Sequence, residues 1–169
     1  STFQAVVHDV RNDTSSVYTL IVKPDQPIAY KPGQFFFIFT DKNGRRSAKA
    51  YSAANSSGQQ FIEFCIKRVD GGYMSNKLYQ LKKGDLLTIG GPYGFFTLQP
   101  VERDAFFIAT GTGVSGLRSM IHDLLNKGTK KTIWLIFGVR TQQDLLYREE
   151  WEALAEQHSN FLFQNLTKS

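Results

Sequence analysis

The sequence is poor in cysteine and histidine, and it contains no long hydrophobic run. Its one cysteine, Cys65, excludes an internal disulfide, a cysteine-ligated iron–sulfur cluster and a multi-cysteine zinc site. Three scattered histidines offer a metal ion few ligands. No apolar stretch approaches the ~18 residues that a membrane-spanning helix requires, and the N-terminus lacks the features of a secretory signal. These absences predict a cytoplasmic protein that binds no metal and does not span a membrane.

The sequence does contain enough apolar residues to fill a core. Its 169 residues are 41% hydrophobic, which excludes intrinsic disorder and fits one large domain or two small ones. The formal net charge of +5 would attract nucleic acid, an anionic cofactor or an acidic protein. The basic residues alternate with glycine turns and form no aromatic and basic platform, so we do not expect nucleic-acid binding.

The first hundred residues have the pattern of antiparallel β structure. Strand-forming runs are separated by turn signals such as Pro32–Gly33 and Asn43–Gly44, and this close spacing is typical of a small barrel or sandwich. We expect a short helix over 74–81, and we expect Gly90-Gly91-Pro92 to break the last strand of this region. The expected strands are 3–10, 17–22, 34–40, 61–69 and 86–89.

After about residue 100 the pattern changes to alternating strands and helices. The strands are continuous apolar runs, as in sheets that are buried on both faces. Their order predicts a parallel sheet with right-handed crossovers, which amounts to about half of a doubly wound domain. The sequence therefore predicts two domains, 1–100 and 101–169, of which the second is incomplete. The expected elements of the second are strands 105–109, 132–139 and 161–166 and helices 116–127 and 144–157.

Two glycine-rich turns are candidate anion sites. Gly111–Gly116 spells G-x-G-x-x-G between a predicted strand and a predicted helix, where small residues let a pyrophosphate approach the backbone N–H groups. A tight turn that needs glycine only for packing is the alternative. Gly71–Ser75 precedes the short helix of the first region and would form another anion cradle. Two such turns in different domains suit two nucleotides, and this pairing favours redox chemistry.

Nucleotide choice depends on the residue that follows the next parallel strand. An NAD site usually has an acidic residue there to bind a ribose hydroxyl, whereas this chain has Arg140. A guanidinium suits a 2′-phosphate and favours NADP over NAD. A surface arginine without a ligand explains the residue nearly as well.

Several segments occur together in a characteristic order: KAYSAAN, GGYMS, GPYG, ATGTGVSGLRSM and FGVRTQQDLLYREEWEAL. This ordered set resembles the ferredoxin–NADP+ reductase superfamily of flavoprotein oxidoreductases, and the resemblance covers nearly the whole chain. It implies an antiparallel Greek-key β-barrel that binds FAD, followed by a parallel α/β domain that binds NADP(H). FMN is the second choice of flavin.

The resemblance also implies roles for individual residues. The Tyr51 ring would pack on the isoalloxazine, and the Ser52 hydroxyl would lie near flavin N5 as part of the catalytic site. Lys49 occupies the place of an arginine that holds the FAD phosphates, with Arg46 as a nearby substitute. Arg140 would share the adenosine 2′-phosphate with Lys168. Further contacts are implied to FAD for Ile66, Lys67, Gly72, Met74 and Ser75, and to the nucleotide pyrophosphate for Thr110, Gly111, Thr112, Gly113 and Val114.

The implied function is a reductase that passes electrons between NADP(H) and a one-electron carrier through FAD. The carrier would be an acidic ferredoxin, flavodoxin or oxygenase component, and the Arg45–Lys49 and Lys82–Lys83 groups would steer its docking. One alternative is an NADH-dependent electron-transfer subunit of a larger oxidoreductase. Another is a truncated flavin-binding module without nicotinamide chemistry, because half of the expected sheet is missing.

Overall fold

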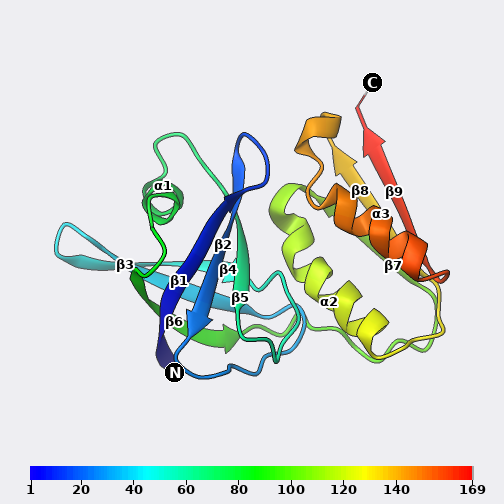
Figure 1. Cartoon of the computed structure of the whole chain (residues 1–169), viewed down its shortest axis with the longest axis horizontal. Helices are drawn as coiled ribbons and strands as arrows, with labels where there is room; N and C mark the ends of the chain where they lie inside the picture. Colours follow the sequence, from blue (N-terminus) through cyan, green and yellow to red (C-terminus); the bar gives the residue numbers. More distant parts are fainter. Residues whose placement is uncertain (169) are drawn as a thin grey trace.

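The computed structural model describes residues 1–168 and places a β-barrel beside a layered α/β unit (Figure 1). The barrel strands pair in the order β4-β3-β6-β1-β2-β5, and every pair is antiparallel. A bridge between Ala53 and Phe64 joins the residue after β4 to β5 and closes the sheet. The six strands are β1 (Thr2–Asn12), β2 (Val17–Pro24), β3 (Phe35–Lys42), β4 (Arg45–Ser52), β5 (Ile62–Lys67) and β6 (Leu86–Tyr93).

The barrel core follows from alternation along the strands. Phe36 and Ile38 of β3 point inward and are fully buried, whereas Phe35 and Phe37 between and beside them face outward. The short helix α1 (Tyr73–Tyr79) lies beside the barrel and buries Leu78. The fold predicted for this region is confirmed.

The predicted break at Gly90-Gly91-Pro92 is wrong, because β6 continues through these residues to Tyr93. The absence of side chains at the glycines makes room for the aromatic side chains of β3. A Cβ atom on Gly91 would lie 2.7 Å from Phe36 Cδ1, and one on Gly90 would lie 3.0 Å from Phe39 Cε2. The register shifts opposite Phe36, so the glycines form an irregular stretch within the strand.

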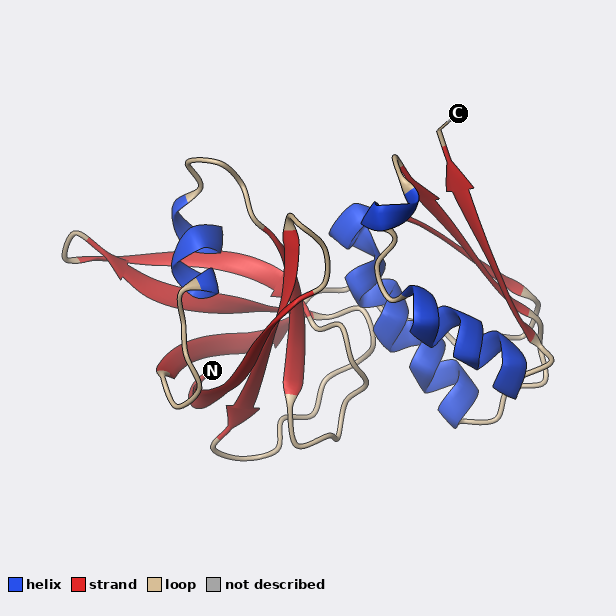
Figure 2. Ribbon diagram, turned by 45° about the horizontal axis from the view of Figure 1, so that its top comes forward, coloured by secondary structure: helices blue, strands red, loops and turns tan. Residues whose placement is uncertain are grey.

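The second unit contains the predicted parallel sheet, in the order β7 (Ala105–Thr110), β8 (Ile133–Val139) and β9 (Phe161–Thr167). Helices α2 (Val114–Asn126) and α3 (Arg148–Gln157) both cover the same face (Figure 2). This side of the sheet contains the buried core of the unit, which includes the fully buried Trp151. No helix within residues 1–168 is long and apolar enough to cross a membrane.

The opposite face of this sheet is open in the described residues, as expected of an incomplete sheet of three strands. Phe106 and Ile108 of β7 are 64% and 72% exposed, and Leu166 of β9 is 52% exposed. The Phe106 ring stacks on Trp134 of β8 along the same face, with ring centroids 6.1 Å apart. Continuous apolar strands usually have cover on both sides. The described residues provide cover on only one side.

The helix expected from Asp144 begins later. Gln142–Asp144 forms a single 3-10 turn, in which Thr141 and Asp144 make a reciprocal capping box. Tyr147 then has a left-handed backbone, with φ of 60°, and α3 starts at Arg148. The acidic residue caps its own short turn, and the change of direction at Tyr147 separates that turn from α3.

Candidate functional site

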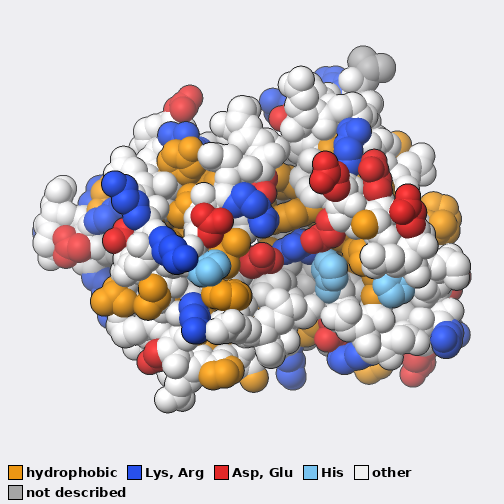
Figure 3. All heavy atoms as spheres, in the orientation of Figure 1, with side chains coloured by type: hydrophobic (Ala, Val, Ile, Leu, Met, Phe, Trp, Pro, Cys, Tyr) orange, Lys and Arg blue, Asp and Glu red, His pale blue; other side chains and the backbone are white. Residues whose placement is uncertain are grey.

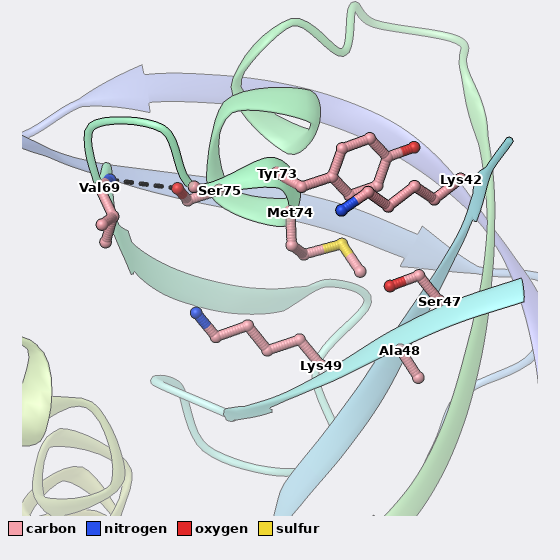
Figure 4. Close-up of a pocket in the computed structure, with 9 residues that line it drawn as sticks. Lys42, Ser47, Ala48, Lys49, Val69, Tyr73, Met74 and Ser75 are labelled. Atoms are coloured by element: carbon pink, nitrogen blue, oxygen red, sulfur yellow. Dashed lines mark hydrogen bonds between the residues drawn. The ribbon is translucent and has the colours of Figure 1, made fainter.

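A first cavity of about 310 Å³ lies between β4 and the turn that leads into α1 (Figure 4). The ammonium groups of Lys42 and Lys49 both point into it, from β3 and β4. Three of its neighbours, Gly72, Met74 and Ser75, come from the GGYMS turn. The structure therefore brings together Lys49 and the turn residues that were predicted to hold one ligand. The lining residues are Lys42, Ser47, Ala48, Lys49, Val69, Gly72, Tyr73, Met74 and Ser75.

The turn beside this cavity is tightly built. Gly71 has φ of +73°, a conformation that side-chain-bearing residues rarely adopt. A Cβ atom on Gly72 would lie 2.9 Å from the Val69 carbonyl oxygen. The Ser75 hydroxyl accepts a hydrogen bond from the Val69 N–H at 3.1 Å (Figure 4), which leaves its own proton free to donate. Met74 is mostly buried, and its Sδ accepts a weak hydrogen bond from Thr40 at 3.5 Å.

Arg46 does not line this cavity, contrary to the expectation that it could substitute for Lys49. Residues an odd number apart on a strand face opposite sides. Arg46 therefore lies on the outer face, where its guanidinium covers the Phe39 ring at 3.8 Å. Of these two basic residues on β4, Lys49 is the one that faces the cavity.

Tyr51 and Ser52 lie at the end of β4 that faces the second unit. The Tyr51 hydroxyl is buried and has no hydrogen-bond partner among the described residues. Burial raises the pKa of Tyr51 to about 12, so the phenol is a neutral donor at physiological pH. A buried donor without an acceptor is costly, and a ligand acceptor beside it would remove that cost. Ser52 lies against the first turn of α2, where a Cβ atom on Gly116 would be 3.9 Å from its hydroxyl oxygen.

A second cavity, of about 760 Å³, lies between the barrel and the carboxyl ends of the parallel strands. Thr110, Gly111 and Thr112 enter it from the glycine turn, and Arg140 and Lys168 enter it from the ends of β8 and β9. These five predicted residues are thus brought together. Its lining consists of Thr14, Ser16, Val17, Lys67, Thr110, Gly111, Thr112, Gly138, Val139, Arg140, Asp144, Leu146, Leu166, Thr167 and Lys168.

Other predicted residues are placed differently. The side chains of Ile66 and Val114 are buried in the hydrophobic cores, so only their backbone groups are free to face a ligand. Gly113 follows Thr112 in the turn but does not line the cavity. Lys67, which was assigned to the flavin side, lines the second cavity with its neighbours on the barrel.

Sequence reasoning missed the barrel's contribution to the second cavity. Thr14 and Ser16 lie between β1 and β2, and the polar segment that contains them indicated only a turn. Lys67, Arg140 and Lys168 give this cavity three cationic side chains, while the Asp144 carboxylate accepts a hydrogen bond from the Thr141 hydroxyl at 2.9 Å. The balance favours an anionic ligand.

Comparison with known proteins identifies the class. A model described as the oxidoreductase FAD-binding domain matches residues 5–98, and one described as the oxidoreductase NAD-binding domain matches residues 107–169. The chain belongs to the ferredoxin–NADP+ reductase superfamily of flavoprotein oxidoreductases, as the resemblance predicted. Its two matched regions are an FAD-binding and an NAD-binding oxidoreductase domain, which supports FAD and a pyridine nucleotide as ligands.

Among relatives, the phenol hydroxylase P5 protein of Acinetobacter pittii (strain PHEA-2) is 36% identical over 165 residues, covering 95% of this chain and 46% of the relative. Ferredoxin–NADP reductase B of Sorangium cellulosum (strain So ce56) is 38% identical over 128 residues, covering 75% of this chain and 52% of the relative. The crystal structure of the Amycolatopsis cytochrome P450 reductase GcoB has a TM-score of 0.90 and 26% identity, covering 99% of this chain and 52% of that one. The chain thus spans about half the length of these relatives.

Proposed function

We propose that this chain is the flavin- and nucleotide-binding part of a reductase that passes electrons between NADP(H) and a one-electron carrier protein. We assign residues 1–100 to FAD binding and residues 101–169 to nucleotide binding. One observation carries this proposal. Ser52, at the end of the strand that borders the first cavity, lies beside the helix that follows the glycine turn of the second; a Cβ atom on Gly116 would be 3.9 Å from its hydroxyl oxygen. Two ligands that extend from the cavities toward this place would meet there.

The residues around the first cavity fit FAD. Lys49 supplies a positive charge, and Ser75 supplies a hydroxyl donor, for a diphosphate beside the glycine turn. At the other end of β4, the partly buried Tyr51 ring offers an aromatic surface, and its unpartnered hydroxyl offers a donor. Lysine keeps the charge of the arginine usual in the family but lacks its bidentate fork, so this phosphate contact depends on salt.

Bound FAD would accept two electrons as a hydride and release them one at a time. The chain's own residues bind and orient, and none is required as a strong base. The Tyr51 ring would pack against the flavin, and its hydroxyl would donate a hydrogen bond to an acceptor on the flavin. Ser52 would donate a hydrogen bond near the site of transfer. Its position beside Gly116 brings barrel and helix close together there, which would help to exclude water.

For the second cavity we propose NADP(H) as the ligand. The Gly111 turn, with φ of +53° at Gly111, would present backbone N–H groups to the pyrophosphate. Arg140 and Lys168, at the ends of neighbouring strands, would hold the 2′-phosphate. NADH is the alternative, because it needs the same turn but not these two cations.

The proposed electron acceptor is an acidic protein, such as a ferredoxin, a flavodoxin or an oxygenase component. The names of the relatives, a phenol hydroxylase protein, a ferredoxin reductase and a cytochrome P450 reductase, support a protein acceptor. Arg45 and Arg46 on the β3–β4 hairpin are exposed, as are Lys82 and Lys83. Figure 3 shows Lys and Arg side chains on the surface of the barrel, including the end where this hairpin lies. These cations would accelerate encounter with an acidic surface, in a manner that salt suppresses.

The open face of the parallel sheet favours a second candidate, a flavin-binding module that lacks nicotinamide chemistry. The deciding experiment is an anaerobic titration of the FAD-loaded chain with NADPH and with NADH, followed by the visible absorbance of the flavin. Bleaching by NADPH at lower concentration supports the reductase, and preference for NADH supports the alternative nucleotide. Bound FAD that neither nucleotide bleaches supports the module. A chain that takes up no FAD refutes both.

A further inference from the structure

Arg118 of α2 makes a concentrated set of ionic contacts between the two units. Its side chain is only 10% exposed. Within the second unit, Nε and Nη2 donate to the two carboxylate oxygens of Glu150 on α3, at 2.7 and 2.6 Å. Toward the barrel, Nη1 donates to Glu63 Oε2 on β5 at 2.6 Å and to the Ala54 carbonyl at 3.3 Å. One guanidinium therefore joins both helices of the second unit to the barrel.

The surroundings hold this guanidinium in one orientation. The Tyr147 ring lies 4.4 Å from Arg118 Cζ, so an aromatic face stacks against the planar group. The bidentate pair with Glu150 fixes the plane of the guanidinium, because two parallel N–H···O bonds require the guanidinium and the carboxylate to be nearly coplanar. Contacts within the second unit therefore fix the position of Nη1, the nitrogen that donates to the barrel.

Arg118 and its carboxylate partners, Glu63 and Glu150, are here called the ion cluster. Arg118 lies close along the chain to the proposed nucleotide turn, and its hydrogen-bond partners lie close to the proposed flavin site. The helix α2 begins at Val114, directly after the Gly111–Gly113 turn. Gly116, two residues before Arg118, lies beside Ser52. On the barrel side, Ala54 follows Ser52 by two residues, and its carbonyl receives Nη1. The same side chain is therefore close in sequence to the nucleotide turn and bonded close to the flavin-side serine.

We propose that Arg118 is a positioning residue that fixes the nucleotide turn relative to Ser52, and so sets the geometry of hydride transfer without touching either ligand. This inference rests on the proposed function. Hydride transfer requires reacting atoms about 3–3.5 Å apart, and a displacement of ~1 Å can slow a reaction on the order of 100-fold. The other hydrogen bonds between the units are longer in the part of the chain described, at 3.3 Å from Gly33 N–H to Ser119 and 3.4 Å between Thr19 and Tyr147.

Two carboxylate variants separate positioning from general stabilisation. Glu63→Gln removes the charge on the barrel side and leaves the Arg118–Glu150 pair intact. Glu150→Gln removes the charge within the second unit and leaves the contact to the barrel. Arg118→Lys keeps the charge but loses the fork. Lys127→Gln is the matched control, because it breaks the ion pair between Asp123 of the same helix and Lys127, the C-cap residue, whose side chain is 72% exposed.

The first measurement is the distance distribution between spin labels on the two units. Labels are attached at Asp25→Cys and Glu152→Cys, both exposed positions, in a Cys65→Ala background without nucleotide. Glu63→Gln and Arg118→Lys should broaden the distribution, while Lys127→Gln should leave it unchanged. An unchanged distribution in Glu63→Gln and Arg118→Lys would overturn the inference, whichever nucleotide the protein uses.

The second measurement is the rate constant of flavin reduction at saturating nucleotide, with FAD and nucleotide affinities determined separately. We expect Glu63→Gln to lower the rate constant about tenfold or more, to change each affinity less than threefold, and to slow reduction more than Glu150→Gln does. Losses that follow the fall in melting temperature across the variants would overturn the inference. If the unsubstituted chain is not reduced at all, the proposed function fails, and the distance distributions still decide whether Arg118 fixes the units.

Discussion

Lowering the pH should reduce the free energy of unfolding, because it protonates Glu150 and weakens the contacts of that carboxylate with Arg118 and His122. Burial alone would raise the pKa of the Glu150 carboxyl, but the hydrogen bonds from Arg118 and the nearby charge of His122 outweigh it and lower the pKa to about 2. The same contacts raise the pKa of Arg118 above its ordinary value, so the guanidinium stays charged. An unfolded chain has the ordinary Glu150 value of 4.5.

The direction of this pH effect follows from the linkage between proton binding and folding. A carboxyl whose pKa is lower in the folded state stabilises the fold above its unfolded pKa, and that stabilisation is lost as the pH falls toward the folded pKa. A difference of about 2.5 pKa units corresponds to roughly 3 kcal/mol at pH 6. At pH 3 about 1.5 kcal/mol is left, and near pH 2 almost none. Partial exposure of the carboxylate makes these values upper limits.

The assay is urea unfolding of the chain and of Glu150→Gln at several pH values between 3 and 7. Glutamine resembles the protonated acid, so the variant should be less stable by ~3 kcal/mol at pH 6, or roughly 6–12 °C in melting temperature. The two proteins should converge as the pH falls below 4.5. Lys127→Gln should stay parallel to the unsubstituted chain throughout. A gap between Glu150→Gln and the unsubstituted chain that does not change with pH would refute the reasoning.

Three further predictions concern the ligands. Lys49→Ala should weaken FAD binding most at low salt and Lys49→Arg should preserve it, whereas equal FAD affinity in all three proteins would show that Lys49 holds no phosphate. Tyr51→Phe should weaken FAD binding several-fold without destabilising the FAD-free chain, because the hydroxyl has no protein partner among the described residues; lower stability without FAD would contradict this. Arg140→Ala should reduce an NADPH preference about tenfold and spare NADH, as nucleotide titrations at two salt concentrations would reveal; an equal loss for both nucleotides would exclude a 2′-phosphate contact.

Local sequence signals predicted much of the fold. Turn signals at Pro32–Gly33 and Asn43–Gly44 bounded β3, and a continuous apolar run identified β8. The glycine turn before α2 identified one candidate ligand site. Errors arose where neighbours in space decide the outcome. Gly90 and Gly91 were predicted to break the strand, yet β6 continues through them. Their lack of side chains leaves space for the rings of Phe36 and Phe39. The left-handed backbone at Tyr147, which delays α3, has no comparable signal in the sequence.

The contact between the two units was beyond prediction for a different reason, because it depends on small and distant residues. Gly33, in the Pro-Gly turn before β3, has φ of +98°, and a Cβ atom there would lie 2.2 Å from the Phe96 carbonyl oxygen and 2.5 Å from Met120 of α2. A Cβ atom on Gly116 would lie 3.7 Å from the Gly33 Cα, so the backbone of the first turn of α2 packs closely on the backbone of the Pro-Gly turn. Such close approach tolerates little displacement in one direction. Arg118, bonded to Glu63 across the junction, would oppose movement of α2 away from the barrel, so the two contacts together would hold the start of α2 beside Ser52.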